Sequence, residues 1–140
     1  MIFADTSALM ALISPSDQFH ADARRAESAI RGRREELWTI DPMVTELWGL
    51  LYRDISVARA DVLVRGLLTR GMRREPVDAQ DYDRAWEIGL QWPDQPFSLA
   101  DRQAFAAIER IRRYRAWSYD HHFAIIRLGP RRALPIEVVR

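Results

Sequence analysis

Short apolar runs alternate with longer segments of helical periodicity along this chain, and that alternation restricts the folds open to it. Residues 1–4 and 37–40 are compact apolar runs, and further strands are predicted over residues 73–77, 115–119 and 134–138. Helices are predicted over residues 6–13, 18–30, 57–69, 79–92 and 98–114, and another begins at Asp41-Pro42. Strands that alternate with helices indicate an α/β domain with a mostly parallel central sheet.

Composition excludes several classes of protein. The chain has 140 residues, 48% of them hydrophobic, which suits one compact domain spanning residues 1–140. It contains no cysteine and all 21 of its basic residues are arginine, so thiolate sites, a phosphate loop of the Walker type and Schiff-base chemistry are impossible. A receiver domain is excluded too, because that family relies on a lysine. No run is long and apolar enough for a membrane span and no secretory leader is evident, so a cytoplasmic location is expected.

Two acidic residues follow predicted strands directly. Asp5 comes after the first apolar run, and Asp120 comes after the strand predicted over residues 115–119. In open α/β sheets, ligands bind beyond the carboxyl ends of parallel strands. The sequence therefore places a candidate site beside these two carboxylates, with Asp5 on the innermost strand.

Four acids are candidates, and each alone has a structural explanation. Asp5 can cap a helix, Asp101 stands three residues after Ser98 as in a capping box, Asp120 can cap a turn, and Glu46 can be a surface residue of its helix. Together they suggest a different role, because carboxylates brought close to one another repel unless they share a cation. Oxygen ligands without thiolates suit Mg²⁺ or Mn²⁺.

Four segments carry a family resemblance. ADTSALMAL (4–12), TELWGLLYR (45–53), FSLADRQAFAAI (97–108) and WSYDHHF (117–123) resemble, in order, the four acidic motifs of PIN-domain proteins. The similarity is closest to the VapC-type toxins, whose last motif resembles residues 120–123. The resemblance implies a three-layer α/β/α PIN-like fold with a mostly parallel central sheet. It also implies a metal-dependent endoribonuclease that leaves a 5′-phosphate and a 3′-hydroxyl.

The same resemblance assigns site residues. Asp5, Glu46, Asp101 and Asp120 would be the catalytic, metal-binding acids, with Glu46 either binding the metal or positioning the attacking water. The hydroxyls expected to support them are Ser7, Thr6 and Ser118. The implied partners are an RNA substrate, a cognate antitoxin protein and a second copy of the chain in a homodimer.

RNA has to be held by groups other than the acids. Arg112, Arg113 and Arg115 form a basic run that could neutralise phosphates, although such a run is also typical of a solvated helix face. His121 and His122 stand beside the predicted site, where they could contact phosphate or simply occupy a surface turn.

Three alternatives remain open. The chain could be a catalytically inactive PIN-like RNA-binding or regulatory module, or a structural α/β protein whose acids only cap helices. A phosphatase that uses Asp5 as nucleophile ranks lowest, because the haloacid-dehalogenase pattern requires an aspartate where this chain has Ser7.

Overall fold

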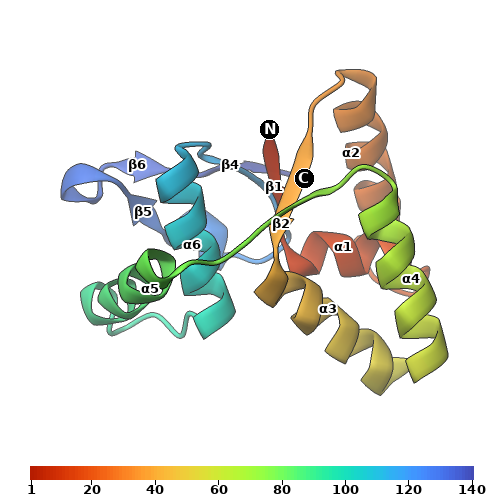
Figure 1. Cartoon of the computed structure of the whole chain (residues 1–140). Coiled ribbons are helices and arrows are strands. Elements are labelled where there is room, and N and C mark those ends of the chain that lie inside the picture. The colour runs from red at the N-terminus through yellow and green to blue at the C-terminus, as the bar shows by residue number, and fades with distance from the viewer.

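The computed structural model describes residues 1–140 and is built on one parallel sheet flanked by helices (Figure 1). The sheet has five strands in the order β3-β2-β1-β4-β7, and every neighbouring pair is parallel. Its strands are β1 (Ile2–Ala4), β2 (Leu37–Ile40), β3 (Arg73–Glu75), β4 (Arg115–Trp117) and β7 (Glu137–Val139). The predicted α/β class with a parallel central sheet is confirmed, and β1 lies at its centre.

Seven α-helices connect and cover the strands. They are α1 (Thr6–Ile13), α2 (His20–Gly32), α3 (Asp41–Asp54), α4 (Val57–Thr69), α5 (Ala79–Gln91), α6 (Leu99–Ile111) and α7 (His122–Ile125). Helices α1 to α4 lie to one side in Figure 1, and α5 and α6 lie to the other. None of the helices is long and apolar enough to span a membrane.

The two faces of the sheet bury separate apolar cores because successive strand residues point in opposite directions. On β1, Phe3 belongs to the core that α5, α6 and α7 complete, whereas Ile2 and Ala4 belong to the core of α1 to α4. On β4, Ala116 belongs to the same core as Phe3, and Trp117 belongs to the same core as Ile2 and Ala4. Burial on both faces explains why the central strands β1 and β2 are mostly apolar in the sequence.

The C-terminal region departs from the sequence prediction. Residues 134–138 were expected to form one strand, but β6 (Leu134–Pro135) pairs antiparallel with β5 (Arg127–Leu128), whereas β7 pairs with β4. A short 3-10 helix (Pro130–Arg132) joins β5 to β6. Buried Ile136 separates β6 from β7, so the chain changes sheets at that residue.

Two element ends also differ from the prediction. Helix α6 stops at Ile111 instead of continuing to residue 114, because Arg112 adopts a left-handed conformation with φ 57°. Strand β4 ends at Trp117, so Asp120 lies on the connection to α7 and not directly at the strand end.

Candidate active site

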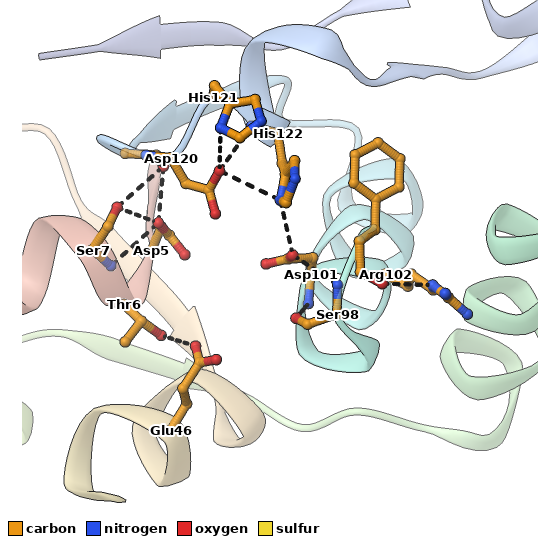
Figure 2. Close-up of polar contacts among 12 residues, drawn as sticks. Asp5, Thr6, Ser7, Glu46, Ser98, Asp101, Arg102, Asp120, His121 and His122 are labelled. Atoms are coloured by element: carbon orange, nitrogen blue, oxygen red, sulfur yellow. Dashed lines mark hydrogen bonds and ion pairs between the residues drawn. The ribbon is translucent and has the colours of Figure 1, made fainter. Parts of the chain in front are cut away.

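The four predicted acids reach the same region from four different elements (Figure 2). Asp5 follows β1, and Asp120 lies on the connection that leaves the neighbouring strand β4. Asp101 comes from the first turn of α6, and Glu46 comes from α3. The parallel arrangement of β1 and β4 causes this convergence, because their carboxyl ends lie at the same edge of the sheet.

Asp5 is buried in a network of two serine hydroxyls. Its Oδ2 accepts hydrogen bonds from the Ser7 backbone N–H (3.2 Å), the Ser7 hydroxyl and the Ser118 hydroxyl (2.8 Å). The same hydroxyls accept hydrogen bonds from the backbone N–H groups of Tyr119 (2.9 Å) and Asp120 (3.0 Å). The serines thus tie the start of α1 to the connection after β4, and they leave Oδ1 of Asp5 without a hydrogen bond.

Glu46 is fixed by the residue that follows Asp5. The hydroxyl of Thr6, which is itself buried, donates a 2.6 Å hydrogen bond to Oε2 of Glu46. This contact joins the start of α1 to α3 across the sequence. It directs the second carboxylate oxygen of Glu46 toward the space between the acids, as Figure 2 shows.

Asp101 is both a helix cap and a member of the acidic group. It forms a reciprocal capping box with Ser98, in which each backbone N–H donates a 3.0 Å hydrogen bond to the other residue's side chain. The capping-box prediction is therefore confirmed. Asp101 is only 7% exposed, and its Oδ2 also lies 3.3 Å from Nδ1 of His122.

Burial and mutual repulsion shift the titration of these acids. Burial raises the pKa of Asp5 to about 6, against the lowering effect of the hydrogen bonds from Ser7 and Ser118, and the charge of Asp101 raises it further. Burial also raises the pKa of Asp101; the backbone hydrogen bond from Ser98 opposes this rise, and the charge of Asp120 adds to it. Burial and neighbouring negative charge therefore oppose the ionisation of Asp5 and Asp101 when no cation is bound.

The donor set fits a hard divalent cation. Asp5 has a free carboxylate oxygen, Glu46 keeps one as well, and Asp5 and Asp101 carry raised pKa values of the kind that a shared positive charge would reverse. Oxygen donors of this kind suit Mg²⁺ or Mn²⁺. The residues present thus match the predicted kind of metal site.

His122 occupies a position that the sequence did not assign. Its side chain is 12% exposed and lies between Asp101 and Asp120, with its ring packed edge-on against Phe97. His121 is 73% exposed, in keeping with a surface turn. Adjacency to Asp120 was the only sequence signal for His122, because α7 has four residues and shows no helical periodicity.

The basic run lies away from the acids. It follows the C-terminal end of α6 and leads into the start of β4, whereas the acids lie at the first turn of α6 and beyond the end of β4. Arg115 pairs there with Glu35 and Glu137. Arg112 and Arg113 are exposed and form no ion pair. The structure therefore does not bring the predicted arginines to the acids.

Comparisons with known proteins identify the family. The PIN domain model matches residues 2–127. The 23S rRNA-specific endonuclease VapC20 of Mycobacterium tuberculosis, found in two strains, is 27% identical over 124 residues, which cover 89% of this chain and 92% of the relative.

Solved structures agree with that result. The crystal structure of VapC20, described as a Sarcin-Ricin loop cleaving toxin, has a TM-score of 0.76 and 25% sequence identity to this chain. The match covers 86% of this chain and 91% of the VapC20 chain. VapBC2 of Rickettsia felis, bound to a promoter DNA fragment, covers 99% of this chain and 98% of its own with a TM-score of 0.72 at 11% identity, which shows a shared fold. The resemblance inferred from the four acidic segments is thereby confirmed, and the chain belongs to the PIN-domain family.

Proposed function

We propose that this PIN-domain chain is a metal-dependent endoribonuclease and the toxin of a toxin–antitoxin pair. The observation that carries the proposal is the convergence of Asp5, Glu46, Asp101 and Asp120 at one sheet edge, in a chain similar over 89% of its length to an rRNA endonuclease. The proposal treats residues 1–140 as one PIN-like domain, because β7 lies beyond the matched region and still completes the sheet.

Each acid has a role that follows from its contacts. Asp5 would bind the cation through Oδ1, since Oδ2 is taken up by the two serines. Asp101 and Asp120 would complete the ligand set, and Glu46 would hold the cation or orient the attacking water with the oxygen that Thr6 leaves free. A bound Mg²⁺ or Mn²⁺ supplies Lewis-acid activation of water and offsets the charge that develops on the phosphate. Water attack with departure of the 3′ oxygen gives a 5′-phosphate and a 3′-hydroxyl.

The hydroxyl residues act as positioning groups. Ser7 and Ser118 orient the Asp5 carboxylate, and Thr6 orients Glu46. Without these contacts the acids would be free to turn away from one another to relieve their repulsion. An inactive RNA-binding module, the alternative function, would have no need of four intact acids held in this way.

Structured RNA is the substrate that we propose, and a hairpin with the sarcin–ricin loop sequence is the first to test, because a similar structure belongs to a toxin that cleaves that loop. In Mg²⁺ or Mn²⁺ the protein should cut the hairpin at a defined bond; excess EDTA should stop the reaction and added Mn²⁺ should restore it. Asp54→Asn, an exposed acid away from the site, serves as the control and should cleave like wild type. Undiminished cleavage in EDTA by nuclease-free protein would refute the metal mechanism, and no cleavage of any structured RNA would favour the inactive module.

Arg112 and Arg113 remain candidates for phosphate contacts to a large RNA. The double variant Arg112→Gln/Arg113→Gln should bind RNA more weakly and flatten the dependence of log K on log salt by up to about two units. Arg115→Gln should leave that slope unchanged, because Arg115 is engaged by Glu35 and Glu137. Filter-binding titrations across salt concentrations measure both slopes, and an unchanged slope in the double variant would assign these arginines to a solvated surface.

Two apolar surfaces could serve the protein partners of a toxin in the cytoplasm. One is an exposed row on α5 formed by Tyr82, Trp86 and Leu90, which are 45%, 53% and 82% exposed. The other is a groove of about 380 Å³ between α1 and α4, lined by Leu12, Ile13, Val62, Leu63 and Leu67. A concave groove suits a segment of an antitoxin, whereas a convex helix row can pair with its own copy about a two-fold axis.

The row on α5 can be tested directly as the homodimer surface. Leu90→Glu should convert the dimer to a monomer, because it places a charge within the apolar contact, at the most exposed residue of the row. Val62→Glu, which lies in the groove, should leave the dimer intact. Light scattering coupled to size exclusion gives both masses, and a monomeric wild type at tens of micromolar would rule out this surface.

A further inference from the structure

A cluster of two imidazoles and a carboxylate lies at the start of α7, at one side of the acidic group. One ligand atom from each of Asp120, His121 and His122 falls within 4.8 Å of the others. Oδ1 of Asp120 is 3.5 Å from Nδ1 of His121 and 3.4 Å from Nδ1 of His122. The backbone N–H of His122 donates a 2.8 Å hydrogen bond to the same oxygen and so fixes the carboxylate toward the rings.

The separations between these ligand atoms suit a tetrahedral metal ion. With Zn²⁺–nitrogen and Zn²⁺–oxygen distances of about 2.0–2.1 Å, neighbouring ligands of a tetrahedral ion are about 3.4 Å apart. The two separations from Oδ1 of Asp120 to the imidazole nitrogens, 3.5 Å and 3.4 Å, have that length. Octahedral Mg²⁺, with ligands at about 2.0–2.1 Å, would require neighbours closer to about 3 Å.

His122 supplies a second and independent observation. Both of its ring nitrogens are inaccessible to solvent, and neither forms a hydrogen bond. Buried polar groups without partners are uncommon and destabilising. A cation on Nδ1 would supply the missing partner, and the neighbouring ligand His121 is 73% exposed.

We propose that Asp120, His121 and His122 form a binding site for a borderline transition-metal ion of the Zn²⁺ class, beyond the Mg²⁺ or Mn²⁺ site of the proposed function. Imidazole ligands select Zn²⁺, Co²⁺ or Ni²⁺ over Mg²⁺. Three protein ligands leave the fourth tetrahedral position to a water molecule, as in open zinc sites. Because Asp120 also belongs to the acidic group, an ion held here withdraws it from a catalytic Mg²⁺, and micromolar Zn²⁺ therefore inhibits Mg²⁺-supported cleavage.

Co²⁺ is the probe, because four-coordinate Co²⁺ has intense visible absorption and the aqueous ion does not. The chain has three histidines and no cysteine, so few sites can compete. Titrating untagged wild-type protein with Co²⁺ should produce the visible bands with one ion per chain. His121→Gln, on an exposed side chain, and His122→Phe, which keeps a ring against Phe97, should each weaken Co²⁺ binding by at least about tenfold.

Two further variants separate this site from the catalytic one. His20→Gln should keep the bands, since His20 binds the Ala11 carbonyl at the far end of α1. Asp5→Asn should keep the bands while losing cleavage, so the spectrum can be measured even if the proposed ribonuclease activity fails. Absence of visible bands in folded wild type, or bands that survive both His121→Gln and His122→Phe, would overturn the proposal in favour of His122 as a plain ion-pair partner of Asp101 and Asp120.

Discussion

Asp5→Asn is expected to lower RNA cleavage by orders of magnitude while making the metal-free protein more stable. Asparagine keeps the shape of the side chain and can still accept the hydrogen bonds from Ser7 and Ser118. It removes a charge that is almost fully buried and that lies beside Asp101. The free energy of unfolding should rise by about 2 kcal/mol at pH 7.5. This rise is somewhat smaller than the free energy that corresponds to two pKa units, because an amide oxygen accepts weaker hydrogen bonds than a carboxylate.

Asp78→Asn is the matched control for this variant. Asp78 is also an aspartate N-cap with a capping box, but it is exposed and begins α5, away from the acids. Asparagine is as good an N-cap as aspartate, so Asp78→Asn should change neither cleavage nor stability appreciably. Urea unfolding in EDTA together with a cleavage assay measures both quantities. Unchanged stability together with normal cleavage in Asp5→Asn would mean that Asp5 is only a helix cap.

The destabilising effect of the Asp5 charge should also appear in the pH dependence of stability. The pKa of Asp5 is about 6 in the folded protein, against an ordinary value of 3.8 for an exposed aspartate, so the folded state binds the proton more tightly than the unfolded state. The stability that protonated Asp5 contributes is therefore fully present below about pH 4, and it is lost as the pH rises through about 6. The metal-free wild type should lose about 2–3 kcal/mol of unfolding free energy relative to Asp5→Asn between pH 4 and pH 7.5.

Paired measurement makes this prediction specific. Other groups titrate over the same range, but they are common to wild type and Asp5→Asn, so the difference between the two free energies isolates residue 5 and the acids coupled to it. Chemical denaturation at several pH values between 4 and 8 gives the difference directly. A difference that stays constant across this range would show that the Asp5 carboxylate titrates normally and is not crowded by charge.

The fold was largely predictable because periodicity and burial agree in most elements. Predicted strand 37–40 and predicted helices 6–13 and 57–69 match β2, α1 and α4 residue for residue. These segments are short, uniformly buried strands or amphipathic helices with clear ends, so their local sequence determines their structure.

The C-terminal region was less predictable because tertiary contacts decide it. Residues 134–138 form an apolar run in the sequence, yet Leu134 pairs with Leu128 and Val138 with Ala116, in different sheets. Helix α6 ends at an arginine in a left-handed conformation, a position that usually carries glycine. No residue in the sequence therefore indicated where the helix ends. Helix α7 has a single turn, which is too short for a periodic pattern.

The candidate site was predictable only as a set. Asp5 and Asp101 each form the helix cap that their local sequence predicts, and nothing in either segment distinguishes a cap from a metal ligand. The distinction comes from topology, since parallel β1 and β4 bring Asp5 close to the connection that carries Asp120. The place of His122 between Asp101 and Asp120 depends on the turn after β4, which the sequence did not determine.

The central claim is that buried carboxylates around Asp5 hold a divalent cation, and thermal unfolding with and without Mn²⁺ tests it most directly. A ligand at about 100 times its Kd stabilises the protein that binds it by about 2.7 kcal/mol. Saturating Mn²⁺ should therefore raise the Tm of wild type and of Asp78→Asn by several degrees, and should leave Asp5→Asn almost unchanged. An equal rise in all three proteins, or no rise in any, would contradict the account.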